Sequence, residues 1–303
     1  KSHWRDLLAF TGTISPYGGA KEISLGLNSF QKIAQAHSFR IIDKHAQPRL
    51  VNRLGRPVIE AIFAFETKLG RGEGVVRVPE SSQKTAWTLL TTLSELRGFP
   101  EKVGLNRPSG EAYSRNFGGS NWLDQRQESI KFSDREPAVL VVGGGQAGLA
   151  VAARLGQLEI ETLVIDKHDR IGDNWRKRYH SLALHNQIHV NHLPYLPFPP
   201  TWPKYIPKDM LANWFELYAD VMQINFWTGT ELINAYYNGR LNHWVATVRQ
   251  NNNSERILKP RHIIFANGVS GIPYKPKLDG LCDFRGEVLH SEGFSNGAEW
   301  TGK

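Results

Sequence analysis

The chain has 303 residues, of which 40% are hydrophobic, 22% charged and 11% aromatic, and these values exclude a miniprotein, a fibre and a disordered chain in favour of about two folded domains. The single cysteine, Cys282, excludes an internal disulfide, a cysteine-rich zinc cluster and a redox pair of thiols. The net charge is +8, but the basic residues are scattered along the chain rather than gathered in a run, so we expect no nucleic-acid partner.

The sequence also bears on location and assembly. No stretch approaches the roughly 18 consecutive apolar residues that a transmembrane segment requires. Because cysteine is used once, we expect a cytoplasmic, reducing environment. The first residue is Lys1 rather than Met, so we expect the natural chain to be longer. Whether the protein forms a homo-oligomer is left open.

Residues 1–125 predict a small α+β domain. Asn28–His37 carries apolar residues at helical spacing behind a cap at its first residue, which predicts a short helix. Val58–Glu66 and Lys84–Leu93 are rich in β-branched and aromatic residues, which predicts strands. The glycine-punctuated segment Lys68–Glu73 predicts the turn of a hairpin between them. No motif in this domain carries chemistry.

Residues 138–303 predict an α/β domain with a mostly parallel, Rossmann-like sheet, and the charged residues 126–137 predict the linker before it. The first three predicted elements have the order of a βαβ unit: strand Ala138–Val142, helix Ala147–Leu158 and strand Thr162–Asp166. The later predicted elements are a helix over Lys208–Met222 and strands over Asn225–Trp227, His243–Arg249 and Ile263–Phe265.

Three glycines, Gly143, Gly145 and Gly148, spell GxGxxG between the first strand and the helix of that unit. The first permits a tight turn, the second lets the backbone approach a pyrophosphate, and the third lets the helix pack close to the strand. Asp166 ends the next strand, where a carboxylate can accept hydrogen bonds from an adenosine ribose. An ordinary glycine-rich turn would leave Asp166 unexplained, so the pattern predicts dinucleotide binding.

Two further segments are similar to parts of flavoproteins that have two dinucleotide domains. Gly172 and Trp175 lie in a basic stretch that charge alone would make a solvated loop, but their order resembles the loop that wraps FAD in those proteins. Ala266-Asn267-Gly268 follows a predicted strand and resembles the ATG segment that returns to the flavin, with Asn267 in place of the usual Thr. The predicted cofactor is therefore FAD.

Phe284, Gly286, His290 and Phe294 form the pattern FxGxxxHxxxF. Alone, His290 would be a surface-loop histidine. These four positions follow GxGxxG and the Ala-Asn-Gly segment in the order of the flavin-containing monooxygenase family, whose fingerprint they match, so the chain resembles that family from about residue 136 onward. Related Baeyer–Villiger enzymes end the fingerprint in Trp, so Phe294 favours the branch that oxygenates heteroatoms.

The resemblance implies a set of site residues. Asn186, in the histidine-rich stretch Tyr179–Pro200, is the implied catalytic contact to the flavin edge, with Asn191 or a merely structural asparagine as the alternatives. The four histidines of that stretch lack HExxH spacing and lie among prolines, so we expect no metal site. The implied FAD-binding residues are Gly143, Gly145, Gln146, Ala147, Gly148, Asp166, Lys167, Asn174, Trp175, His185, Asn267 and Gly268.

By resemblance, the protein is a FAD- and NADPH-dependent monooxygenase. In the family, NADPH reduces the flavin, and a flavin C4a-hydroperoxide passes one atom of molecular oxygen to a small nucleophilic nitrogen, sulfur or carbonyl substrate. The NADPH domain, with its own glycine motif, is expected beyond Lys303, so this chain alone is expected to be inactive. No nucleophile elbow competes with this interpretation.

Two alternatives remain. One is another FAD-dependent oxidoreductase, although a disulfide reductase needs a thiol pair that a single cysteine cannot form. The other is a noncatalytic or degenerate dinucleotide-binding interaction protein. Residues 1–125 resemble the cone-like α+β domain that precedes some related monooxygenases, with packing or dimerisation favoured over small-molecule binding as its role.

Overall fold

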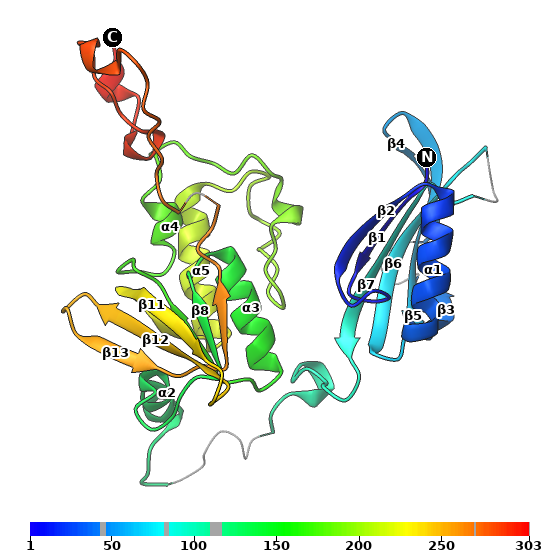
Figure 1. Ribbon diagram of the computed structural model, residues 1–303, viewed down its shortest axis with the longest axis horizontal. Helices are drawn as coiled ribbons and strands as arrows, with labels where there is room; N and C mark the ends of the chain where they lie inside the picture. Colours follow the sequence, from blue (N-terminus) through cyan, green and yellow to red (C-terminus); the bar gives the residue numbers. More distant parts are fainter. Residues whose placement is uncertain (43–46, 82–84, 110–116, 270, 303) are drawn as a thin grey trace. The chain divides into compact units, whose positions relative to one another are not determined.

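The computed structural model describes residues 1–42, 47–81, 85–109, 117–269 and 271–302. It divides into two compact units, Lys1–Glu101 and Lys102–Lys303, here called the N-terminal and C-terminal units (Figure 1). In the described residues, no helix has both the length and the apolar composition needed to cross a membrane.

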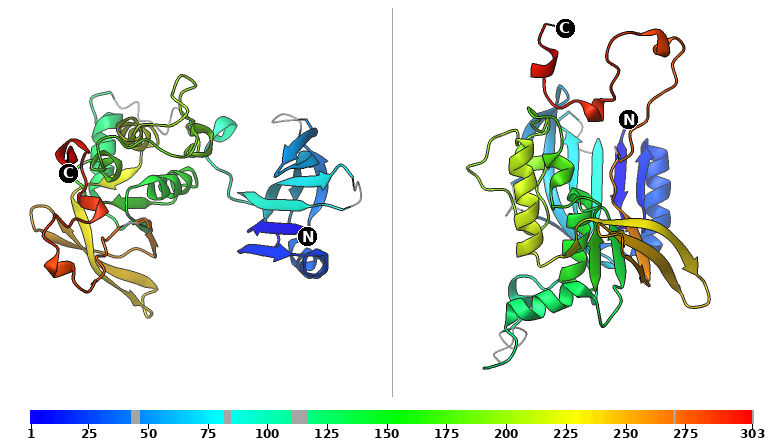
Figure 2. Two further views of the ribbon diagram at one scale, coloured as in Figure 1. Left: turned by 90° about the horizontal axis from the view of Figure 1, so that it is seen from above. Right: turned by 90° about the vertical axis from the view of Figure 1, so that its left-hand side faces the viewer.

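The N-terminal unit is a mixed sheet with helix α1 along one face (Figures 1 and 2). The sheet order is β2-β1-β7-β6-β5-β3, with β4 also paired to β5. Only β1 and β7 run parallel among the described pairs. The core between α1 and the sheet is aromatic, and includes Trp4, Phe10, Phe63 and Phe65. The expected α+β class is therefore confirmed. The elements are β1 His3–Leu7, β2 Ile14–Gly18, α1 Ala20–Ala34, β3 His37–Ile41, β4 Arg49–Arg53, β5 Arg56–Glu66, β6 Gly70–Pro79 and β7 Thr88–Leu96.

The first helix begins earlier than the sequence predicts. Asn28 lies inside α1, and the residue that precedes the helix is Gly19, which offers no side chain as a cap. The chain leaves the helix at Gln35, which adopts the left-handed conformation. The start was missed because no capping side chain marks it.

The predicted hairpin has a different second strand. β5 confirms the strand predicted over Val58–Glu66, but its antiparallel partner is β6, which begins at Gly70 within the predicted turn. The strand predicted over Lys84–Leu93 corresponds to β7, which pairs with the other edge of β6. The first residue of that predicted strand, Lys84, lies outside the described residues.

The C-terminal unit is built on a parallel sheet of order β10-β9-β8-β14 and a separate antiparallel sheet of order β11-β12-β13. The βαβ unit and the later helix and strands predicted from the sequence are confirmed, and β11 and β13 were not predicted. The elements are α2 Trp122–Lys131, β8 Val139–Val142, α3 Gln146–Gln157, β9 Thr162–Ile165, α4 Asp173–Arg176, α5 Lys208–Val221, β10 Asn225–Trp227, β11 Thr230–Asn238, β12 His243–Gln250, β13 Glu255–Leu258 and β14 His262–Phe265.

The parallel sheet is buried on both faces, which explains its unbroken apolar strands. Val141 and Val164 pack in one cluster with residues of α3 and α5. Leu140 and Ile165, which alternate with them along the same strands, pack in a second cluster with β12 and β13. The C-terminal unit is thus a Rossmann-like three-layer α/β structure, as expected. Its glycine turn lies at the carboxyl end of β8.

The predicted linker is partly helical. α2 begins behind Asn121, whose side chain accepts a hydrogen bond from the Asp124 N–H while the Asp124 carboxylate accepts one from the Asn121 N–H. From α2, Arg126 donates a 2.7 Å hydrogen bond to the carbonyl of Ile224. Residues 126–131 therefore belong to the C-terminal unit, and the two compact units divide after Glu101 instead.

Candidate functional site

The glycine turn after β8 has room for glycine alone at two of its three motif positions. Gly143 has a φ of +105°, and a Cβ there would lie 2.5 Å from the carbonyl oxygen of Ala266, just after β14. A Cβ on Gly148 would lie 1.9 Å from the carbonyl oxygen of Gly143. The turn is therefore held tightly between α3 and the residue that follows β14.

Helix α3 begins at this turn without a side-chain cap. Its N-cap residue is Gly145, and the first turn contains no acidic side chain. The first backbone N–H groups of a helix have no partner within the helix, and the helix dipole places partial positive charge there. An uncapped helix start inside a glycine turn is a general binding site for phosphate groups.

Asp166 connects this turn to the end of β9. Its Oδ2 accepts a 2.8 Å hydrogen bond from the Gly144 N–H, and its Oδ1 accepts bonds from the N–H and the ring Nδ1 of His168 at 2.9 and 2.7 Å. A carboxylate oxygen can accept two hydrogen bonds, so Oδ2 keeps capacity for a further donor. The sequence-based interpretation did not include His168, although its position two residues after Asp166 was a local signal. The neighbouring Lys167 is exposed.

The short helix α4 approaches the glycine turn from the other side. A Cβ on Gly145 would lie 3.0 Å from Nδ2 of Asn174, and Trp175 donates a 3.2 Å hydrogen bond from Nε1 to Oε1 of Gln146. The Oδ1 atom of Asn174 is buried with no hydrogen-bond partner among the described residues. A buried, unpartnered oxygen beside an uncapped helix start is suited to a ligand that carries both hydroxyl and phosphate groups.

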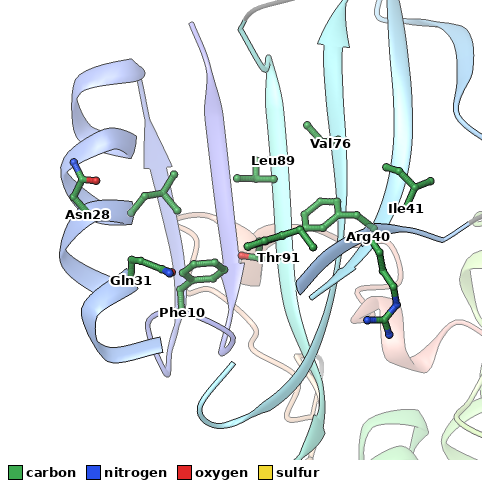
Figure 3. A pocket seen from close by; sticks show the side chains of 11 residues that line it. Phe10, Asn28, Gln31, Arg40, Ile41, Val76, Leu89 and Thr91 are labelled. Atoms are coloured by element: carbon green, nitrogen blue, oxygen red, sulfur yellow. The ribbon is translucent and has the colours of Figure 1, made fainter. Parts of the chain in front are cut away.

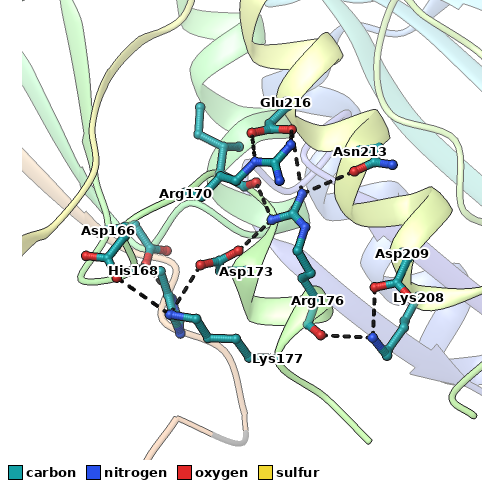
Figure 4. Close-up of polar contacts among 12 residues, drawn as sticks. Asp166, His168, Arg170, Asp173, Arg176, Lys177, Lys208, Asp209, Asn213 and Glu216 are labelled. Atoms are coloured by element: carbon teal, nitrogen blue, oxygen red, sulfur yellow. Dashed lines mark hydrogen bonds and ion pairs between the residues drawn. The ribbon is translucent and has the colours of Figure 1, made fainter. Parts of the chain in front are cut away.

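A polar network attaches the loop before α4 to helix α5 (Figure 4). Arg170 forms a bidentate ion pair with Glu216, and Arg176 bonds to Asp173 and approaches Glu216. Burial by itself would raise the pKa of Asp173, but hydrogen bonds from Arg176 and Lys177 outweigh it and lower the pKa below its ordinary value. Asp173 is therefore a carboxylate that carries its charge although it is almost fully buried.

Two more contacts fix this loop against α5. Lys208, only 6% exposed, donates a 2.9 Å hydrogen bond from Nζ to the carbonyl of Arg176 and pairs with Asp209. Gly172 has a φ of +88°, and a Cβ there would lie 2.4 Å from the carbonyl oxygen of Ala212. Lys208 lies 32 residues beyond Arg176 in the chain, and no local sequence pattern indicates their contact.

The histidine-rich segment meets the start of α5 through its backbone, because the Lys208 N–H donates a 3.0 Å hydrogen bond to the carbonyl of Leu182. His185 and Asn186 are exposed, and the only described hydrogen bond of Asn186 is through its carbonyl, which accepts from Asn191. His192 accepts a hydrogen bond from the Phe198 N–H at Nδ1. Within the described ranges, no group of three or more His, Cys, Asp or Glu residues could hold a metal ion.

The fingerprint segment lies beside the start of that histidine-rich stretch. The ring of Phe294 is 6.2 Å from that of Tyr179, and the His180 N–H donates a 2.7 Å hydrogen bond to the carbonyl of Ser295. His290 accepts a 3.1 Å hydrogen bond at Nδ1 from the Glu292 N–H. The ring of Phe284 covers Gly286, where a Cβ would lie 2.5 Å from it.

The predicted site residues thus fall into two groups. One group lies around the start of α3: Gly143, Gly145, Gln146, Ala147, Gly148, Asp166, Asn174 and Trp175, with the exposed Lys167 next to Asp166 and the exposed Asn267 and Gly268 just after Ala266 beside the turn. The described contacts do not connect His185, Asn186 or the fingerprint residues to that turn.

Comparison with known proteins agrees with this geometry. Residues 141–200 match the family model described as NAD(P)-binding Rossmann-like domain. Indole-3-pyruvate monooxygenase YUCCA1 from Oryza sativa subsp. japonica is 30% identical over 168 residues, which cover 55% of this chain and 40% of that protein. The probable indole-3-pyruvate monooxygenase YUCCA8 from Arabidopsis thaliana is 31% identical over 168 residues, covering 54% and 39%.

A solved flavin-containing monooxygenase from Stenotrophomonas maltophilia is 24% identical and superposes with a TM-score of 0.49, covering 55% of this chain and 48% of that one. The resemblance to flavin-containing monooxygenases expected from the motifs is confirmed by the sequence relatives. The chain spans about 40% of the length of the curated relatives it matches.

Proposed function

We propose that the C-terminal unit binds FAD and that the protein is a FAD- and NADPH-dependent monooxygenase. The observation that carries the proposal is the uncapped start of α3 at Gly145, with the unpartnered buried oxygen of Asn174 beside it. The similarity to indole-3-pyruvate monooxygenases supports the flavin chemistry over other uses of a dinucleotide-binding turn.

The residues around the turn fit the parts of the cofactor. Backbone N–H groups at Gln146 and Ala147 would bind the pyrophosphate, because they open a helix without a capping side chain. Asp166 would accept from the adenosine ribose with the free capacity of Oδ2, and Asn174 would contribute its unpartnered oxygen. Bound FAD would supply the oxygen-activating chemistry, whereas the protein holds and shields it.

The relatives' names favour one substrate class. Nitrogen nucleophiles, sulfur nucleophiles and carbonyl compounds are the classes expected for such an enzyme, and the relatives are named after indole-3-pyruvate, a 2-oxo acid. We therefore propose a small carbonyl compound as the substrate, with molecular oxygen as the second reactant. This choice departs from the heteroatom branch that Phe294 favours, and Asn186 remains the proposed contact to the flavin edge.

Three further parts of the proposal concern the whole protein. NADPH is proposed to bind outside residues 1–303. A cytoplasmic location is consistent with the free, exposed Cys282. Self-association is proposed to reside in the N-terminal unit if the protein forms oligomers, because the sheet face opposite α1 carries half-buried apolar side chains such as Leu90.

The first experiment is to mix the purified chain with FAD, FMN or NAD, remove free nucleotide by gel filtration, and identify the retained nucleotide after heat release. We expect FAD at one equivalent with the visible spectrum of bound flavin. A folded chain that retains none of the three overturns the FAD assignment.

The second experiment measures NADPH oxidation and oxygen incorporation by the longest natural form of the protein, with indole-3-pyruvate, a tertiary amine and a thioether as substrates. Incorporation from molecular oxygen into the 2-oxo acid supports the proposed substrate class. FAD retention with no turnover of any substrate favours the noncatalytic dinucleotide-binding protein instead.

A further inference from the structure

The N-terminal unit contains a cavity of about 600 Å³ between α1 and the sheet, within the size range of sites for small organic ligands. Three aromatic rings line it: Phe10 after β1, which is labelled in Figure 3, Phe39 on β3 and Phe63 on β5. The rings of Phe39 and Phe63 lie 6.2 Å apart, and Phe65 stacks on Phe39 at 5.3 Å. The cavity therefore has an aromatic wall contributed by separate parts of the chain.

The sequence of β6 creates this space. A Cβ on Gly74 would lie 2.4 Å from the ring of Phe63, and a Cβ on Gly72 would lie 2.4 Å from the ring of Phe65. The rings therefore lie directly on the backbone of β6, where any larger residue would push them toward α1. Val76, the next residue on the same face, lines the cavity. Because Gly72 and Gly74 have no side chains, the rings of Phe65 and Phe63 can lie against the β6 backbone, and the cavity between the sheet and α1 stays unfilled.

Arg40 is the only charged residue among the described residues that line the cavity, and the polar side chains of Thr91 and Gln31 already have hydrogen-bond partners. The Thr91 hydroxyl donates a 2.6 Å hydrogen bond to Asp6 and accepts a 2.9 Å bond from Nε1 of Trp4. Gln31 exchanges two hydrogen bonds with the backbone of Ala36. Figure 3 shows the side chain of Arg40 extending away from the rings.

The remaining polar side chains define the ligand further. Asp6 is fully buried beside Thr91, so a ligand with its own negative charge would be repelled. Asn28, an exposed residue on α1, also lines the cavity, and its side chain has no hydrogen bond to the described residues. Apart from Arg40, the described lining residues carry no charge, so the aromatic wall favours an uncharged ring compound that has few polar groups.

We propose that the N-terminal unit binds one uncharged, ring-containing small molecule in this cavity, contacted by the rings of Phe10, Phe39 and Phe63. The role favoured from the sequence was packing or dimerisation, and a ligand on the α1 side of the sheet leaves the opposite sheet face open for it. The proposal is independent of FAD binding, which depends on residues of the C-terminal unit.

A pair of fluorescent probes with the same ring skeleton tests the charge preference. N-phenyl-1-naphthylamine is uncharged, and 8-anilino-1-naphthalenesulfonate adds a sulfonate to that skeleton. Titrated into the whole chain, the uncharged probe is expected to saturate at one equivalent and to bind at least tenfold more tightly. Tighter binding of the sulfonate, or no saturable binding of the uncharged probe by the folded chain, overturns the proposal.

Matched substitutions on β6 test whether the uncharged probe binds in this cavity. Val76→Phe fills the cavity, and Val75→Phe makes the same change at the adjacent residue, whose side chain points to the opposite face of β6. We expect Val76→Phe to weaken binding of the uncharged probe at least tenfold and Val75→Phe to leave it within twofold. Equal effects of the two changes would place the probe elsewhere.

A second cavity variant keeps the test informative if Val76→Phe does not fold. Ile41→Trp changes a half-exposed lining residue on β3 and should fold like the parent in a thermal melt. It is expected to weaken probe binding as well. Probe binding that instead depends on protein concentration, together with a mass of two chains by light scattering, would mean that a second copy occupies this face and would overturn the small-molecule assignment.

Discussion

The backbone N–H of Gly144 donates a 2.8 Å hydrogen bond to Oδ2 of Asp166, joining residues 22 positions apart. Through Oδ1, the same carboxylate also holds the backbone and ring of His168. The acidic residue that the sequence associates with a ribose therefore also assembles the protein's own loops around the start of α3. Its removal would affect the folded chain before any ligand is added.

Asp166→Ala is expected to lower the free energy of unfolding by about 1–3 kcal/mol, because two backbone N–H groups lose their acceptor. It is also expected to weaken FAD binding at least tenfold, measured by quenching of flavin fluorescence. Asp134→Ala, at a side chain 76% exposed, serves as the control and should change neither quantity. Unchanged FAD affinity in the Asp166 variant would contradict the proposed ribose contact.

Gly148→Ala and Gly156→Ala make the same change on helix α3 with opposite expected results. At Gly148 the new Cβ would lie 1.9 Å from a backbone oxygen, so we expect a loss of about 1–3 kcal/mol from strain and a loss of FAD retention. At Gly156 nothing lies within 4 Å, so the higher helix propensity of Ala should stabilise by up to about 1 kcal/mol. Thermal melts and gel filtration with FAD check both. Equal stability of the two variants would refute the close packing of α3 on the turn.

Lys208→Met tests the contact between the end of α4, at Arg176, and the start of α5. The carbonyl of Arg176 would lose its partner, which should cost about 1–3 kcal/mol of unfolding free energy. FAD affinity should fall while the spectrum of the bound flavin stays unchanged, because Lys208 acts through the loop. The exposed Lys21→Met in α1 is the control. An intact FAD affinity in a destabilised Lys208 variant would show that the contact is structural only.

Glu60→Gln tests a charge cluster on the N-terminal sheet. Glu60 accepts hydrogen bonds from Arg53, Arg77 and Arg49, and these lower its pKa from 4.5 to about 2 against the opposing effect of burial. A lowered folded-state pKa stabilises the fold above pH 4.5, and this stabilisation is lost as the pH falls from 4.5 toward 2.

The melting temperature of the parent should therefore exceed that of Glu60→Gln at pH 7, by an amount equivalent to about 1–3 kcal/mol. The gap should close as the pH falls from 4.5 to 2. Glu80→Gln, at an exposed residue, should melt like the parent throughout. A gap that does not vary with pH would mean that the Glu60 charge contributes no stability.

The Rossmann-like part of the fold could be predicted because the patterns that specify it lie within short stretches of the sequence. Unbroken apolar strands such as Val139–Val142, buried on both faces, and glycines at a fixed spacing are visible in any single sequence. α2 was also predictable in principle, since Asn121 and Asp124 have the spacing of a capping box, but its charged residues were interpreted as a linker.

The remaining elements depend on distant partners. β6 contains Gly72 and Gly74, which disfavour a strand locally, and it forms one because β5 and β7 pair with both its edges. Lys208 contacts Arg176 only after α5 packs against the loop. No sequence pattern of either segment alone encodes these contacts, so the lining of the cavity and the network could not be predicted.

Gly172, Arg170 and Arg176 hold one loop to one helix at several points, through Ala212, Glu216 and Lys208. Inserting or deleting a single residue between positions 170 and 176 would shift all of these partners at once. Over evolutionary time, this loop can therefore change its chemistry through replacement of side chains far more readily than through a change in length.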